Sequence, residues 1–283
     1  MTITAKMVQE LRERSGAPMM DCKRALEASG GDLEAAIDHL RKSGLKSADK
    51  RAGRETAQGL VGMFLGSGAR SGAMVAVSCE TDFVARNENF TNLVTALALH
   101  VEALRPASVE ELLGQTLKTT RATVSEAVKE LAGKLGENMR IAQIAHFEAP
   151  NGRVGGYVHH DQKKGALVAV GSTAPEAQAA PFLSSLGKHI VAFQPVALSR
   201  ESVPAEVVER ERAIYRESEE VLAKPEDKRE RIVAGKLEKF LAGSVLLEQP
   251  WVHDPNVIVT TALRSALGEN AAILGFERFQ VGA

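Results

Sequence analysis

Apolar side chains at helical spacing predict three short helices within residues 1–45. Thr4 is suited to cap the first helix, Pro18 to stand in the first turn of the second, and Asp32 to cap the third. The third helix is expected to end at Gly44, because glycine is common just past a helix end. The pattern therefore predicts a compact bundle that is too small to be an enzyme and suits a docking module.

A second pattern, in which short apolar runs flank polar turns, occurs twice in the rest of the chain. Residues 59–64 and 72–77 recur 93 positions later as residues 152–157 and 165–170, and eight of nineteen positions across each span are identical. An apolar run, a polar turn and a second apolar run predict a β-hairpin in each copy.

The similarity between the copies continues beyond the hairpins. A helical stretch follows each hairpin, and the sequence Leu-Gly-Glu-Asn stands at 135–138 and again at 267–270 before a last strand. Each copy therefore predicts the order strand, strand, helix, helix, strand. The fold class that follows is α+β, with a duplicated α/β core.

The second copy is longer than the first by 43 residues, which fall near residues 200–245. They are rich in Glu, Arg and Lys and carry an apolar stripe interrupted at Pro225, which predicts an inserted antiparallel helical hairpin. Such a hairpin suits a contact arm, although the residues alone favour a decoration without function. The stripe comprises Val207, Val208, Ile214, Val221, Leu222, Ile232, Val233, Leu237, Phe240 and Leu241.

These patterns divide the chain into five parts. They are a three-helix docking module at 1–45, a polar linker at 46–58, a first core half at 59–150, a second core half at 151–199 and 246–283, and the hairpin at 200–245.

Composition narrows the class of partner. The 35 Lys and Arg residues balance 36 Asp and Glu residues, so no basic excess indicates a nucleic-acid backbone as the main partner. Two distant cysteines, Cys22 and Cys79, fit small buried side chains in a reducing cytoplasm better than a disulfide. The chain has neither a signal-peptide pattern nor an apolar run long enough to span a membrane.

Motifs of covalent or cofactor chemistry are also missing from the sequence, and Trp251 is expected in the core. The glycine-rich turn at 66–72 resembles a phosphate loop, but its counterpart at 159–165 is not glycine-rich, so both are interpreted as hairpin turns. His159 and His160 are expected to point to opposite faces of a strand, which argues against a shared metal ion. No cofactor and no metal are therefore expected.

The segment Cys79–Asn87 follows the apolar run 73–77, which predicts a buried strand with a sharp exit loop. In one interpretation, Asp82 caps the next helix and Phe83 enters the core, and the residues alone favour it. In the other, Phe83 is an exposed wedge with an acidic neighbour.

The helix that begins after Pro18 poses a similar question. Met19 lies on its predicted apolar face, together with Cys22, and Met20 stands one position beside that face. Met20 is either an adaptable exposed contact or packs on a neighbouring helix, and the sequence favours neither.

The chain resembles the elongation factor Ts family, the guanine-nucleotide exchange factors of elongation factor Tu, and the two strongest motifs of the resemblance are residues 12–23 and 81–87. The resemblance covers nearly the whole chain and implies a ubiquitin-associated-like N-terminal module. It also implies that Arg12, Met19 and Met20 contact the nucleotide-binding domain of the partner.

The same resemblance implies roles for the exit loop. Phe83 would wedge between two helices of the partner and Asp82 would disturb its magnesium ion, while Thr81 and Val84 shape the loop. His159 falls where family members carry a partner-contacting histidine. Many relatives continue past the last strand into a further helix, which this sequence does not show.

The implied function is release of GDP from elongation factor Tu in the cytoplasm, without covalent chemistry, direct nucleic-acid binding or membrane binding, and with a 2:2 assembly through the core. Two other interpretations remain open. One is a non-catalytic scaffold that binds a partner without affecting its nucleotide. The other is an enzyme with a small-molecule pocket at the seam of the two repeats.

Overall fold

The computed structural model describes residues 2–282, apart from the side chain of Lys46. Residue 1 of the predicted docking module and residue 283 of the predicted second core half lie outside the described residues. At the N-terminus, α1 (Ala5–Ser15), α2 (Met19–Ala28) and α3 (Leu33–Arg51) pack together. Two predicted caps are confirmed: Thr4 Oγ1 accepts from Met7 N at 3.3 Å, and Asp32 Oδ1 accepts from Ala35 N at 2.8 Å. The buried side chains of this bundle are Val8, Leu11, Ala17, Cys22, Ala25, Leu26 and Ala36.

The predicted end of the third helix at Gly44 is wrong, because α3 continues to Arg51. Residues 46–51 of the predicted linker are therefore helical. The physical reason is tertiary: α3 crosses α7 (Val124–Leu135), and the backbones approach closely where Gly44 meets Gly133. Ion pairs Lys129–Asp49 at 2.7 Å and Arg41–Glu130 at 3.7 Å flank the crossing. Packing thus prolongs a helix that local propensity would end.

Within residues 2–282, the core strands form two three-stranded antiparallel sheets, which confirms the predicted hairpins. The first sheet has the order β1-β2-β3 and the second has the order β4-β5-β8. Each middle strand shifts register at an equivalent point, Ala76/Val77 in β2 and Ala169/Val170 in β5. The strands are β1 (Gln58–Leu65), β2 (Ser71–Cys79), β3 (Met139–Glu148), β4 (Gly152–Val158), β5 (Lys164–Gly171) and β8 (Ala272–Gln280).

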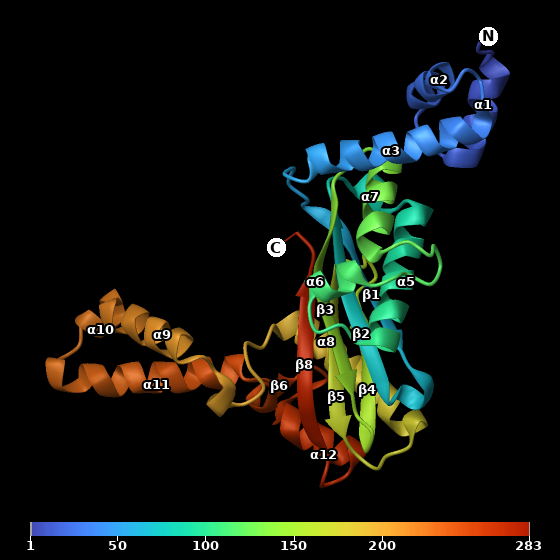
Figure 1. Cartoon of the computed structure of the whole chain (residues 1–283). Helices are drawn as coiled ribbons and strands as arrows, with labels where there is room; N and C mark the ends of the chain where they lie inside the picture. The colour runs from blue at the N-terminus through green and yellow to red at the C-terminus, as the bar shows by residue number, and fades with distance from the viewer. Residues whose placement is uncertain (1, 283) are drawn as a thin grey trace.

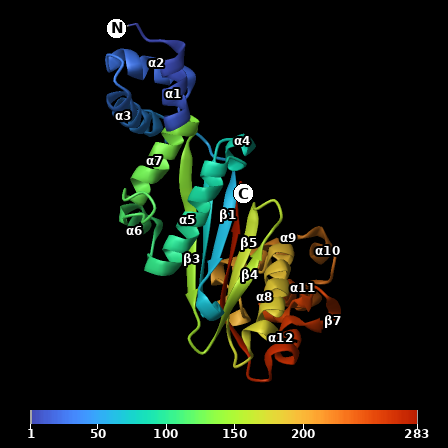
Figure 2. The same ribbon diagram turned by 90° about the vertical axis from the view of Figure 1, so that its right-hand side faces the viewer.

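The two sheets face each other, and helices cover their outer faces (Figures 1 and 2). Alternation along the strands produces this layering: Leu60 packs under the helices of the first half, whereas Val61 packs between the sheets with Leu167 and Phe279. The covering helices are α5 (Glu88–Leu104) and α7 in the first half, and α8 (Glu176–Phe193) and α12 (Val259–Leu267) in the second.

The predicted order of each half holds, with additions that the sequence did not indicate. A short helix α6 (Val109–Gly114) lies in the first half, and a small hairpin of β6 (Pro250–Trp251) and β7 (Asp254–Ile258) lies in the second. Trp251 is buried, as are both cysteines, in agreement with the sequence. No helix within residues 2–282 is both long and apolar enough to cross a membrane.

The insertion is an antiparallel helical hairpin that projects from the second half of the core (Figure 1). Its helices are α9 (Ala205–Glu217), α10 (Glu219–Leu222) and α11 (Glu226–Ser244). The apolar seam is thin, because Ile214 and Leu222 are 52% and 50% exposed, so not all of the predicted stripe is buried. Ion pairs such as Arg216–Glu230 at 2.9 Å and Lys236–Glu220 at 2.6 Å join the two arms.

Candidate partner-binding site

The exit loop after β2 turns directly into the short helix α4 (Asp82–Ala85). Thr81 has extended backbone dihedrals, and its Oγ1 accepts from Val84 N at 3.4 Å, so Thr81 caps this helix. The interpretation in which Asp82 is the cap is therefore wrong. Asp82 instead stands in the first turn and pairs with Arg86 at 3.1 Å on the protein surface.

Phe83 is 83% exposed, so the interpretation that placed it in the core is also wrong. The next two residues, Val84 and Ala85, are buried and fill the space beneath the helix. Because successive helical residues are about 100° apart, burying these two side chains turns Phe83 outward. A large aromatic side chain is thus presented to solvent on a folded segment.

A second exposed apolar site lies on the N-terminal bundle. Arg12, Met19 and Met20 line one groove of about 660 Å³ between α1 and α2, together with Ile3 and Val8. Met20 is 59% exposed, as an adaptable contact would be. Met19 is 52% exposed rather than buried, because the interior of the bundle is already filled by residues further along α2. The three residues singled out in the sequence therefore do lie together.

These two apolar sites lie toward the same end of the molecule. In Figure 2, α4 stands at the end of the core that is nearest the N-terminal bundle.

His159 lies in the turn between β4 and β5, past the end of the strand. Its Nδ1 hydrogen-bonds with the hydroxyl of Tyr157 at 2.9 Å, and its ring lies 4.3 Å from that of His160. The expectation that the two histidines point to opposite faces is wrong, because strand alternation has ended at Val158. No cluster of three metal-ligating side chains occurs within residues 2–282.

The turn that carries His159 reaches the first half of the core. Lys163 Nζ donates to Gln58 Oε1 at 2.6 Å, and Gln162 O accepts from Val61 N at 2.6 Å. Gln58 is the register partner of Cys79, where the exit loop begins. His159 is therefore at the same end of the sheets as the exit loop.

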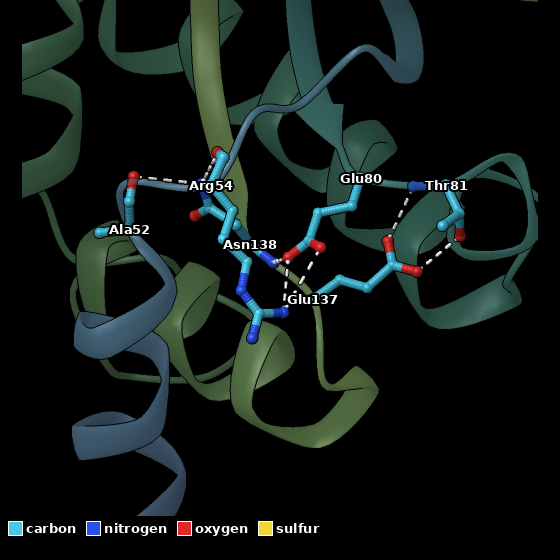
Figure 3. A network of polar contacts seen from close by, with 6 residues as sticks. All are labelled: Ala52, Arg54, Glu80, Thr81, Glu137 and Asn138. Carbon is cyan, nitrogen blue, oxygen red and sulfur yellow. Dashed lines mark hydrogen bonds and ion pairs between the residues drawn. The ribbon is translucent and has the colours of Figure 1, made fainter.

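The residues that fix the exit loop were not identified as functional in the sequence (Figure 3). Thr81 N and Oγ1 donate to the two carboxylate oxygens of Glu137, at 3.0 and 2.5 Å. In return, Asn138 N donates to Glu80 Oε1 at 2.6 Å. The duplicated Leu-Gly-Glu-Asn was the available signal, but it indicated only a repeat.

Cys79, the last residue of β2, is not a candidate nucleophile. Burial, followed by the nearby negative charge of Glu137, raises the pKa of the Cys79 thiol to about 12. Its Sγ donates to Thr81 O at 3.2 Å, which further links the strand end to the loop. The thiol is therefore protonated at neutral pH and acts as a structural group.

The fold and the site define a class of α+β protein in which a bundle of three helices stands on a core of two three-stranded sheets and apolar side chains are exposed on both parts. A family model described as "Elongation factor TS" matches residues 80–283. The chain belongs to the elongation factor Ts family, and thus among the elongation factors of protein biosynthesis.

Individual relatives align over the whole chain. An elongation factor Ts of Bartonella bacilliformis is 41% identical, with 100% of this chain and 94% of that protein covered. One of Chlorobium phaeobacteroides is 37% identical, with 99% of both covered. One of Legionella pneumophila is 38% identical, with 99% of this chain and 92% of that protein covered.

Proposed function

We propose that this chain is a guanine-nucleotide exchange factor that binds GDP-bound elongation factor Tu and promotes release of GDP during translation elongation in the cytoplasm. Family membership implies the exchange role. The observation that carries the proposal is the presentation of Phe83, 83% exposed, on a helix whose cap is bound by a carboxylate.

A GTPase holds GDP through a phosphate-binding loop and a magnesium ion. The factor must therefore stabilise a partner conformation in which these contacts are broken, and nucleotide and factor then weaken each other's binding reciprocally. Accelerating release ~10⁴-fold requires about 5.5 kcal/mol of differential stabilisation. Burying one Phe side chain supplies about 1.5–3 kcal/mol, so other contacts with the partner must supply the rest of the differential stabilisation.

Within this mechanism, the exit loop acts on the nucleotide site. Phe83 inserts between two helices of the partner, and Asp82 disturbs the magnesium ion and its phosphate contacts. Asp82 is able to take this role because, within the described residues 2–282, the ion pair that it forms is the exposed contact with Arg86, which is weak enough to be exchanged. Thr81 and Val84 shape the loop by capping and anchoring α4.

The groove lined by Arg12, Met19 and Met20 binds the nucleotide-binding domain of the partner and holds it in place while the exit loop acts on the nucleotide site. Flexible methionine side chains adapt to an apolar helix face, and Arg12 adds a charge at the edge. The second core half, including His159, contacts another domain of the partner. No step requires covalent chemistry, nucleic acid or a membrane.

Release of a fluorescent GDP analogue from elongation factor Tu, with excess unlabelled GDP, tests the function. Catalytic amounts of the chain should accelerate release, and Phe83→Ala should lose most of that acceleration while remaining folded. Leu99→Ala is the control, because Leu99 is a 46% exposed apolar residue on α5 and has no assigned role. If Phe83→Ala released GDP at the wild-type rate, insertion of Phe83 between two helices of the partner would be excluded as the cause of exchange.

Binding without acceleration by the parent chain would instead identify a non-catalytic scaffold. A 2:2 assembly with elongation factor Tu through the core is part of the same proposal. Sedimentation of the mixture should show a complex with two copies of each protein, whereas a 1:1 mass would exclude it.

A further inference from the structure

Two segments far apart in the sequence, residues 80–81 and residues 137–138, are joined by reciprocal hydrogen bonds at the base of the exit loop. These contacts are called the clasp below. Glu80, from the loop, binds the backbone N–H of Asn138, and Glu137, from the turn before β3, binds the backbone N–H and hydroxyl of Thr81. Each segment thus gives a carboxylate to the other's backbone (Figure 3). Hydrogen bonds to a charged acceptor are the stronger kind.

The clasp determines the orientation of Phe83. Helix α4 has four residues, which is too short to be stable by itself, so its direction depends on its ends. Its N-cap is Thr81, whose hydroxyl donates to Glu137 and accepts from Val84 N. Phe83 lies between the capping residue and the buried Val84, so a shift of Thr81 moves the aromatic ring.

The clasp also reaches the N-terminal bundle. The side-chain amide of Asn138 is buried and donates to Ala52 O at 3.2 Å and to Arg54 O at 2.8 Å. Ala52 is the C-cap of α3, the helix that belongs to the bundle bearing the methionine groove. Arg54 adds its guanidinium 3.5 Å from both Glu80 oxygens. One set of contacts therefore joins the exit loop to the C-terminal end of α3.

The second half of the core provides an internal comparison. It carries the same Glu-Asn pair as Glu269 and Asn270, but both are exposed. The turn there is closed differently, because Ser172 Oγ donates to Leu267 O at 2.9 Å. The clasp is therefore not needed to form a turn between helix and last strand in this repeat.

We propose that Glu137 and Asn138 are positioning residues for nucleotide exchange: Glu137 holds Phe83 in the orientation that acts on the partner, and Asn138 couples that loop to the N-terminal bundle. This inference rests on the proposed function. Neither residue needs to touch the partner, and both act through Thr81 and its neighbours.

The test compares Glu137→Gln with Glu269→Gln, the same change at the matching turn of the second half. Glu137→Gln should lower the maximal GDP-release rate at saturating factor about ten-fold, with little change in the concentration for half-maximal effect. Glu269→Gln should leave both unchanged. Circular dichroism and thermal unfolding check that each variant is folded.

A double-mutant cycle separates positioning from a general structural role. If Glu137 acts through Phe83, Glu137→Gln should have almost no further effect in a Phe83→Ala background. Additive losses would overturn the assignment. For Asn138→Ala, the cycle with Met20→Ala is measured on the factor concentration for half-maximal release and should be non-additive. Additivity there would contradict the coupling of the exit loop to the bundle.

Hydrogen exchange gives a readout that does not depend on the partner. The amides of Thr81 and Val84 should lose protection in Glu137→Gln and keep it in Glu269→Gln. Unchanged protection, or an unchanged release rate while the parent is active, would overturn only this inference. A parent chain that fails to accelerate release would overturn the proposed function, and the positioning role with it.

Discussion

The crossing of α3 and α7 makes a sharp prediction, because its two glycines are not equivalent. A Cβ added to Gly133 would lie 2.8 Å from the Cα, C and O atoms of Gly44. A Cβ added to Gly44 would lie 3.7 Å from the Cα of Gly133, which is an ordinary contact. Gly44→Ala should therefore be tolerated, whereas Gly133→Ala should force the helices apart.

The magnitudes follow from two opposing effects. Alanine is about 0.8–1.0 kcal/mol more favourable than glycine inside a helix, and both variants gain from this. Forcing backbone atoms apart in a packed contact costs about 1–3 kcal/mol, and only Gly133→Ala incurs that cost. Since the shared gain largely cancels, the two variants should differ by about 1–3 kcal/mol in the stability of α3 docking.

Native-state hydrogen exchange of the α3 and α7 amides measures that docking directly, and urea unfolding gives the global stability. Gly235→Ala is a matched control, because Gly235 lies inside α11 and an added Cβ would have no other described residue within 4 Å beyond its own stretch of helix. It should show the propensity gain alone. Protection in Gly133→Ala equal to or above that in Gly44→Ala would refute the reasoning.

Further predictions concern binding, reactivity and pH. Met20→Ala should raise the factor concentration for half-maximal GDP release about ten-fold and keep the maximal rate; a fall in the maximal rate alone would contradict a binding role. Cys79, with a thiol pKa of about 12, should react with iodoacetamide at pH 8 only after unfolding, and mass spectrometry of the native protein would reveal any earlier labelling. Burial lowers the pKa of His189 from its ordinary 6.5, so the unfolded chain binds more protons and stability should fall as the pH drops below 6.5. His189→Leu should flatten that dependence of the urea midpoint, and an unchanged slope would exclude His189 as its source.

Much of the architecture could be predicted because its signals are local or repeated. Alternating apolar residues define strands wherever they occur, and the duplication made each hairpin support the other. The end of α3 could not be predicted, since Gly44 is a poor helix residue that is kept helical by its contact with Gly133. The β6-β7 hairpin was missed because its strands, 250–251 and 254–258, are too short for a periodic pattern.

The candidate site was predictable only as a set of positions. The sequence indicated an exit loop after β2 and two methionines at the start of a helix, but whether Phe83 and Met19 are buried depends on whether other side chains already fill the core. Val84 and Ala85 do so beneath α4, which leaves Phe83 outside. Short-range spacing contains no information about that competition.

By itself, the sequence determined the helix caps at Thr4 and Asp32, because these depend on residues within a few positions of one another. It also determined the repeat and the inserted hairpin, because the two copies can be aligned from the sequence alone. Only the tertiary structure decided which carboxylates meet which backbone groups. Glu137 binds Thr81 and Glu80 binds Asn138 across more than fifty positions, and only folding of the sheet brings those segments together.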